Sequence, residues 1–290
     1  MERLVPNKIL NEILKESTDD ILTNHFLGML AFHVGRNDEA LKLLNLAKNI
    51  NPDNTEILYN LSNAQFRAGL IDLATNNLKN VIRLNSNYCE AYSLMGEILL
   101  NTDKPEQATE YLSKAIKIQP KYWRALYTLG IVRKKNGDLD KAICYFEQTI
   151  AIKSDYADAY INLANCYQEK NKLNKAIKNL KQAILYKSDS EIAYYNLANV
   201  LKINNQQNEA IDFYRKAISI KPDFEQAQYN LGDTLIATGN FAAAFNHYRK
   251  AYSLRPKNPK YKSKMHQCLG KIKFSSINDS LYDWHIKMHT

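Results

Sequence analysis

The sequence has few of the residue types that mark several other classes of protein. Its 290 residues include four cysteines, Cys89, Cys144, Cys166 and Cys268, which show no paired spacing and fall inside predicted helices. Because disulfide frameworks and metal sites place cysteines at characteristic spacings, we expect reduced thiols in a cytosolic protein. The nine glycines form no phosphate-binding loop, so no nucleotide or other cofactor is expected.

Long apolar runs are missing as well. No stretch of about 18 apolar residues occurs, so no segment is expected to span a membrane. The first residues, MERLVPNKILNEILKEST, contain no continuous apolar core, so no signal peptide is expected and a cytoplasmic location is predicted. His285 and His289 could share a helix face, but no third ligand accompanies them, so no metal site is predicted. Without a catalytic constellation, the chain is not expected to be an enzyme.

What the sequence does contain is a repeat of fixed length. The segment 191–224, EIAYYNLANVLKINNQQNEAIDFYRKAISIKPDF, fits again without insertions at 21, 55, 89, 123, 157 and 225, in steps of 34 residues. Counting Ile21 as position 1, each position of the repeat can be compared across seven copies. Position 20 is alanine in all seven: Ala40, Ala74, Ala108, Ala142, Ala176, Ala210 and Ala244.

Small and large positions predict where two helices cross. Position 8 is always small: Gly28, Ser62, Gly96, Gly130, Ala164, Ala198 and Gly232. Position 24 is always large: Leu44, Leu78, Leu112, Phe146, Leu180, Tyr214 and Tyr248. Because helices approach closely only where side chains are short, the small positions are expected at the crossing, with the large side chains filling the space beside it.

Two further positions predict the ends of helices. Position 15 is Gly35, Gly69, Asp103, Gly137, Asn171, Asn205 and Gly239, all residues that tolerate a left-handed backbone. The first helix of each repeat is therefore expected to stop there. Position 32 is proline or serine throughout, from Pro52 to Pro256, and proline cannot continue a helix that has just ended.

The chain thus resembles the tetratricopeptide repeat (TPR) family, whose members repeat a helix–turn–helix of this length. The resemblance implies an all-α fold, a right-handed superhelical solenoid of antiparallel helix pairs. We predict an N-terminal capping half-repeat (1–20), a C-terminal capping helix (259–273) and a tail (274–290). Between them we predict seven repeats: 21–54, 55–88, 89–122, 123–156, 157–190, 191–224 and 225–258.

The resemblance also implies where a partner binds, because the first helix of each pair lines the concave groove in this family. Positions 5, 6 and 9 of these helices are rich in asparagine and tyrosine. The predicted peptide-binding residues are Asn60, Asn63, Asn162, Asn165, Asn196, Asn199, Asn230, Asp233, Tyr59, Tyr127, Tyr195 and Tyr229. Asparagine offers both a donor and an acceptor, as a peptide backbone does, so Asn162, Asn196 and Asn230 are predicted as central contacts of an extended peptide.

An alternative role for these asparagines stays open. Asparagine also occurs at positions expected on outer faces, such as Asn76, Asn77 and Asn80, and asparagines in first helices could instead organise the stack. The predicted ladder is interrupted at Leu94 and Thr128. Lysine is absent from position 5, where the family's carboxylate clamp requires it, so that mode of peptide binding is not expected.

A narrower resemblance suggests a second function. The phrases YNLANVLK and EAIDFYRKAISIKPDF are similar to the repeats of O-linked N-acetylglucosamine transferases, in which an asparagine ladder binds the acceptor polypeptide. The predicted function is a scaffold or adaptor that binds a protein or peptide partner. The alternative is the substrate-recruiting part of a larger glycosyltransferase or sulfotransferase. Whether two arrays form a homodimer is left open.

The net charge of +9 raises the question of nucleic acid. The lysines of the chain are distributed over the second helices and the C-terminal cap. This distribution favours a solvated outer surface, and a nucleic-acid partner is not predicted. Acidic protein partners remain an alternative.

Overall fold

The computed structural model describes residues 20–272. The secondary-structure elements in this range are all α-helices, as predicted. Fifteen helices and no strand occur in this range. They divide into two compact units, of which unit 1 ends at Ile152 and unit 2 begins at Lys153. The predicted half-repeat at 1–20, apart from Asp20, and the tail at 274–290 lie outside the described residues.

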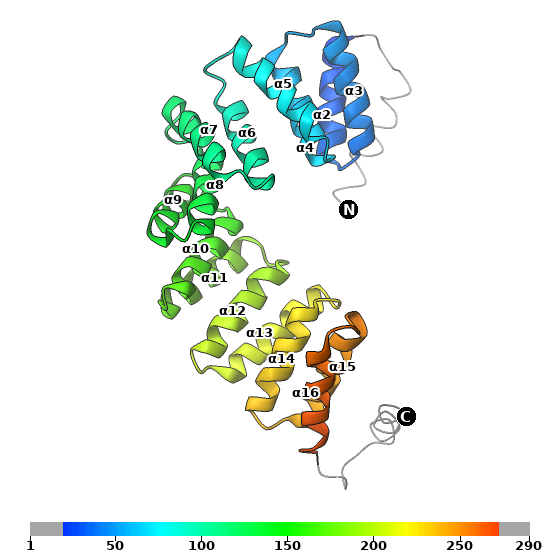
Figure 1. Cartoon of the computed structure of the whole chain (residues 1–290), viewed down its shortest axis with the longest axis vertical. Coiled ribbons are helices and arrows are strands. Elements are labelled where there is room, and N and C mark those ends of the chain that lie inside the picture. The colour runs from blue at the N-terminus through cyan, green and yellow to red at the C-terminus, as the bar shows by residue number, and fades with distance from the viewer. Residues whose placement is uncertain (1–19, 273–290) are drawn as a thin grey trace. The chain divides into compact units, whose positions relative to one another are not determined.

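The described part of unit 1, residues 20–152, forms four helix pairs, which can be followed in Figure 1. Its helices are α2 (Ile21–His33), α3 (Asn37–Ile50), α4 (Thr55–Arg67), α5 (Ile71–Leu84), α6 (Cys89–Asn101), α7 (Pro105–Ile118), α8 (Trp123–Lys135) and α9 (Leu139–Ile152). The first helices begin at 21, 55, 89 and 123, which reproduces the spacing of 34 residues read from the sequence.

The described part of unit 2, residues 153–272, continues the same pattern with three pairs and one further helix. Its helices are α10 (Ala157–Glu169), α11 (Leu173–Tyr186), α12 (Glu191–Ile203), α13 (Gln207–Ile220), α14 (Glu225–Ala237), α15 (Phe241–Leu254) and α16 (Pro259–Leu269). The last helix is shorter than the predicted span of 259–273, because Gly270 occupies its C-cap. Tyr261, Met265 and Cys268 form its buried side.

The turn inside each pair has the left-handed backbone predicted at position 15. All seven residues there have a positive φ, between 55° at Asn171 and 84° at Gly35. The residue that follows donates its N–H to a carbonyl five residues earlier, as Arg36 does to Ala31 at 2.9 Å and Gln206 does to Leu201 at 2.9 Å. This bond satisfies a carbonyl that the end of the helix leaves free, which fixes where the second helix starts.

The asparagines at these turns allow a prediction. A left-handed backbone costs an L-residue roughly 1–2 kcal/mol, and asparagine less than most. We therefore expect Asn205→Gly to raise the free energy of unfolding by up to about 0.5–1 kcal/mol. Gly137→Val should lower it, although no atom lies within 4 Å of the added Cβ. Urea denaturation of each variant would measure both changes, and equal effects of the two substitutions would contradict the assignment of strain.

The helices of a pair cross at the small positions, as predicted. A Cβ added at Gly96 would lie 2.5 Å from Leu112 Cγ, and one added at Gly130 would lie 2.6 Å from Phe146 Cε1. Either contact is closer than carbon atoms can approach, so glycine is what allows these helices to meet.

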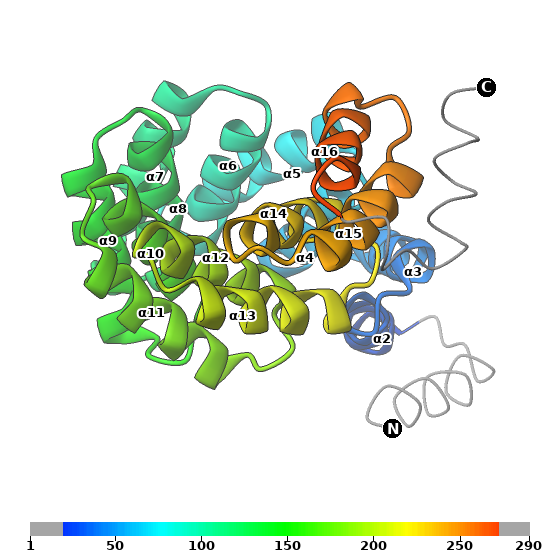
Figure 2. The same ribbon diagram turned by 90° about the horizontal axis from the view of Figure 1, so that it is seen from below.

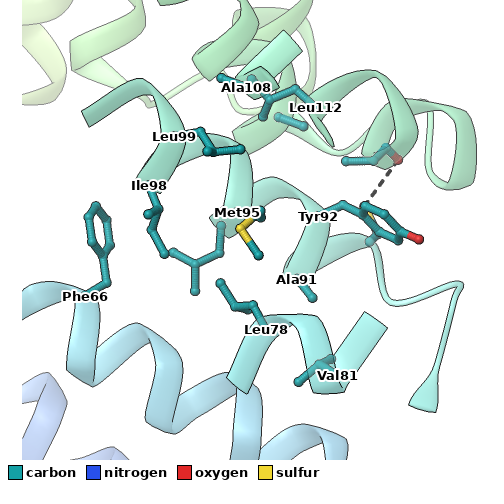
Figure 3. Packing of buried hydrophobic residues seen from close by; sticks show 14 of the residues in the cluster. Phe66, Leu78, Val81, Ala91, Tyr92, Met95, Ile98, Leu99, Ala108 and Leu112 are labelled. Carbon is teal, nitrogen blue, oxygen red and sulfur yellow. Dashed lines mark hydrogen bonds between the residues drawn. The ribbon is translucent and has the colours of Figure 1, made fainter. Parts of the chain in front are cut away.

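One core cluster of unit 1 extends from α4 to α8 and so joins neighbouring helix pairs. Figure 3 shows side chains of α4, α5, α6 and α7 converging around Met95. Met95 is 1% exposed, and Leu78 and Leu112 are fully buried beside it. Since each helix of about 13 residues is marginal alone in water, this burial between neighbouring pairs stabilises the helices.

Candidate functional site

The first helices of unit 2 bring most of the predicted asparagines together. Helices α10, α12 and α14 contact one another in succession and appear as a row in Figure 2. Position 6 contributes Asn162, Asn196 and Asn230, and position 9 contributes Asn165, Asn199 and Asp233. All six side chains are half-buried. These six predicted residues therefore lie on adjacent helices of one unit.

Four of these asparagines form hydrogen bonds between successive repeats. Asn196 donates its Nδ2 to Asn165 Oδ1 at 3.2 Å, and Asn230 donates its Nδ2 to Asn199 Oδ1 at 2.9 Å. In both pairs position 6 of one repeat donates to position 9 of the repeat before it, 31 residues earlier. We call Asn165, Asn196, Asn199 and Asn230 the asparagine ladder.

Tyrosines of the second helices support position 9 from inside the unit. Tyr214 donates its hydroxyl to Asn199 Oδ1 at 2.6 Å, and Tyr248 donates to Asp233 Oδ1 at 2.7 Å. Both rings are fully buried. Burial raises the pKa of each hydroxyl above its usual range, and at Tyr248 the bond to Asp233 adds to this effect.

Helix α16 repeats the contact between position 6 and position 9 of the preceding repeat, with a lysine in place of asparagine. Lys264, at position 6 of α16, lies 2.8 Å from Asp233 Oδ1. The hydrogen bond to this carboxylate raises the pKa of the lysine. Asp233 thus accepts from Tyr248 and Lys264 just as Asn199 accepts from Tyr214 and Asn230.

The sequence alone did not predict hydrogen bonds for Tyr214 and Tyr248, which were expected only as large side chains that fill the space beside the helix crossing. A signal was present, because tyrosine replaces leucine or phenylalanine at position 24 only in the two repeats where it bonds to position 9. The hydroxyl then needs an acceptor on the facing helix, since a buried hydroxyl without a partner is costly.

The predicted tyrosines at position 5 are packed against other aromatic rings. The ring of Tyr195 lies 4.8 Å from Phe224, and that of Tyr59 lies 5.4 Å from Tyr88. Tyr127 packs against Phe146, and Tyr229 packs against Tyr248 and Tyr261. All four position 5 side chains are half-buried, so each presents part of its surface and is held by its neighbours.

Unit 1 does not contain the ladder. Asn60 Nδ2 lies 2.8 Å from His25 Nε2, and Asn63 is half-buried. In the next two repeats Leu94 joins the buried core and Thr128 donates its hydroxyl to Arg124 O in its own helix. The interruption predicted from these two residues follows from an apolar side chain and a hydroxyl that bonds within one helix.

Two asparagines make hydrogen bonds that the sequence did not predict. Asn162, predicted as a central contact, donates its Nδ2 to Asp158 O in its own helix at 3.0 Å. Asn77, expected on an outer face, is 5% exposed. It donates to Gln65 Oε1 at 2.9 Å and accepts from Lys48 Nζ at 3.1 Å, so it joins three helices of unit 1.

The described residues contain no candidate metal site. Within 20–272, no group of three or more histidine, cysteine, aspartate or glutamate side chains could hold a metal ion. His285 and His289 lie outside that range. Burial raises the pKa of Cys89 and of Cys268 to about 11, so both thiols are protonated at neutral pH. In the same range no helix is both long enough and apolar enough to cross a bilayer.

The helix pairs, left-handed turns and glycine crossings define a helical repeat protein of the tetratricopeptide kind. A family model described as "Tetratricopeptide repeat protein 21 N-terminal ARM repeat" matches residues 7–206. Two models described as "Tetratricopeptide repeat" match residues 192–224 and 225–258. The first match covers more than half of the chain, so the chain belongs to this tetratricopeptide repeat family, and the resemblance is confirmed. No curated protein matches the chain.

Solved structures agree on the fold. A chain in the crystal structure of the APC/C hetero-tetramer Cut9–Hcn1 has a TM-score of 0.72 and 19% identity, with 81% of this chain and 46% of that chain covered. PilW, a type IV pilus biogenesis factor, has a TM-score of 0.65 and 17% identity, and the match covers 74% of this chain and 98% of PilW. MamA has a TM-score of 0.53 and 26% identity, and the match covers 58% of this chain and 98% of MamA. The present chain thus spans less than half of the first of these proteins. Proteins with this fold generally serve as scaffolds for protein interactions.

Proposed function

We propose that the chain binds an extended polypeptide along α10, α12 and α14, with the asparagine ladder and the position 5 tyrosines as its contacts. The proposal rests on one observation. In each ladder side chain, one of the two polar atoms of the amide takes no part in the hydrogen bonds between repeats. Among the described residues, none bonds to Oδ1 of Asn196 or Asn230, or to Nδ2 of Asn165 or Asn199. The pair Asn196–Asn165 and the pair Asn230–Asn199 therefore each offer a ligand one acceptor, the position 6 Oδ1, and one donor group, the position 9 Nδ2.

This arrangement suits a peptide backbone, which presents N–H and C=O groups in alternation. The bonds inside each pair fix the amide planes, so little side-chain freedom is lost when a peptide binds. Each bond to the peptide contributes roughly 0.5–1.5 kcal/mol net. A few such bonds give weak affinity, and the exposed parts of Tyr195 and Tyr229 add apolar contact area with a polar tip.

The two roles of the asparagines can be separated by substituting position 9. In Asn165→Asp/Asn199→Asp, a carboxylate oxygen still accepts from Asn196, Asn230 and Tyr214, as Asp233 already does from Tyr248 and Lys264. The substitution removes only the two amide donors offered to the peptide. We expect the melting temperature to change little and peptide affinity to fall roughly ten-fold, as the loss of two bonds predicts.

The probe would be a peptide selected from a random phage-displayed library on the wild-type protein, with affinity measured by fluorescence polarisation. Asn208→Asp/Asn246→Asp is the matched control, because both residues are exposed on other helices of unit 2 and add the same charge. Methylating single backbone nitrogens of the peptide should also weaken binding. Equal affinity for the position 9 variant, the control variant and the wild type would overturn the proposal.

A further inference from the structure

The positive charge of the chain is concentrated in unit 2. Residues 153–272 contain 19 lysines and arginines against 10 aspartates and glutamates, a net charge of +9. Residues 20–152 contain 15 against 14, a net charge of +1. The two units are of similar size and built from the same repeat, so the fold itself does not require this difference.

On the second helices of unit 2 the cations occupy the same two positions of the repeat. Position 25 is Lys181 on α11, Arg215 on α13 and Arg249 on α15, and position 26 adds Lys216 and Lys250. All five side chains are exposed. We call these five residues the basic row. Because equivalent positions of stacked repeats face the same way, the row follows one side of the second helices, away from the ladder on the first helices.

Few anions oppose the row. Helices α11 and α15 contain no aspartate or glutamate. On α13, Asp212 lies 3.6 Å from Arg215, but both side chains are more than half exposed and such a pair holds little energy. In unit 1 the same two positions are Asn45, Leu46, Lys79, Asn80, Ser113, Lys114, Glu147 and Gln148. Four helices there carry a net charge of +1 at these positions, against +5 on three helices in unit 2.

We propose that the basic row is a second interaction surface, which binds an acidic segment of a protein partner through its carboxylates. This inference is independent of the ladder, because it concerns other helices and another chemistry. Five exposed cations in a line raise the local concentration of a polyanion and speed its association.

The surroundings of the row favour carboxylates over nucleic acid. Proteins that bind single strands place aromatic rings beside the cations, on which bases stack. Next to the row, position 22 is Lys178, Asp212 and Asn246, and position 29 is Leu185, Ser219 and Ser253, so neither position carries a ring. Rings at the other flanking positions do not form an exposed series along the row, because Phe213 and Tyr252 are half-buried and Tyr186, at one end, is 42% exposed. The nearby rings of Tyr194 and Phe213 lie under Lys216, 5.8 and 5.6 Å from its Nζ, and are half-buried.

The test compares two variants of equal net charge. One replaces the five residues of the row by glutamine. The other replaces five exposed cations of unit 1 by glutamine: Lys42, Lys79, Arg83, Lys117 and Lys121. The probe is a fluorescent polyglutamate of about 20 residues in low salt of about 50 mM, where screening is weak. We expect the row variant to bind at least about ten-fold more weakly than the wild type and the unit 1 variant to lose about two-fold or less.

Two controls separate the effect of the charges from an effect on folding. Circular dichroism and melting temperature would confirm that both variants fold, and Lys181→Arg/Lys216→Arg/Lys250→Arg should retain affinity because it keeps the charge. Equal losses in the two glutamine variants would mean that net charge alone acts, which overturns the row. So would an absence of polyglutamate binding by the wild type. Tighter binding of an oligothymidine of matched charge would overturn the choice of an acidic protein segment.

Discussion

Truncating Leu112 to alanine is expected to lower the free energy of unfolding by about 3–5 kcal/mol, as for other fully buried leucines. Leu112 is the large side chain of α7 that faces Gly96 of α6, and it belongs to the core cluster that extends from α4 to α8. Removing it leaves a cavity at the point where the two helices cross. The rest of the core cannot close this cavity without moving the helices, because neighbouring repeats hold them on both sides.

Gly96→Ala is expected to be destabilising alone and harmless beside the first change. In an open helix this substitution would stabilise by about 1 kcal/mol. Here the new Cβ meets Leu112 Cγ at 2.5 Å and Cδ2 at 2.7 Å. Ala164 and Ala198 occupy the same position in unit 2, so the crossing can relax and the cost should be about 1–2 kcal/mol. In the Leu112→Ala background the clash is gone, and the substitution should be neutral or stabilising.

The four proteins of this cycle would be compared by urea denaturation and by hydrogen exchange of the α6 and α7 amides. Hydrogen exchange is needed because repeat arrays can open locally rather than in one step. Gly270→Ala is the matched control, since a Cβ there would come no closer than 3.7 Å to another atom. If Gly96→Ala cost the same with and without Leu112, close helix approach would not be the reason for glycine at position 8.

Raising the pH above about 10 is expected to unfold the protein within a narrow range, because its buried tyrosines resist ionisation. Burial raises the pKa of seven tyrosines above the usual value for tyrosine: Tyr59, Tyr88, Tyr122, Tyr160, Tyr214, Tyr229 and Tyr248. In the unfolded chain these groups lose their protons near pH 10. Above that pH the folded state binds more protons than the unfolded state, so its stability falls as the pH rises.

The raised pKa of Lys264 acts in the same direction, since its pairing with Asp233 is fully present only below the pKa of a free lysine. Far-ultraviolet circular dichroism and the tyrosinate absorbance near 295 nm would be followed together between about pH 8 and pH 12. Part of the absorbance change should occur only as the helical signal is lost, because the buried tyrosines ionise on unfolding. Tyr214→Phe/Tyr248→Phe should start less stable at neutral pH, because two hydrogen bonds are lost, and should depend less steeply on pH. Ionisation of all 19 tyrosines with the helices intact would contradict this expectation.

Much of the local structure could be predicted because a repeat displays the same requirement several times. The left-handed turns were predicted from position 15, where the backbone conformation depends on the residue itself and its immediate neighbours. The crossing points were predicted from the small residues at position 8, since a close approach of two backbones excludes a side chain whatever the partner. A single copy would have shown either pattern only weakly.

The candidate site could be predicted only in part. The sequence indicated that Asn196, Asn199 and Asn230 lie together on first helices, because their positions recur. It did not indicate that Asn230 donates to Asn199 and that Tyr214 donates to the same oxygen. Nor did it distinguish Asn162, whose amide bonds within its own helix, from Asn196.

The sequence by itself determined the repeat length, the helix pairs, their turns and the crossing residues, because each depends on local conformation or on side-chain size at a recurring position. Only the tertiary structure decided which half of each ladder amide bonds to the neighbouring repeat and which half forms no hydrogen bond among the described residues. The physical reason is that hydrogen bonds across repeats depend on how far each helix is rotated and shifted against the next. That relation is fixed by packing over residues about 31 positions apart.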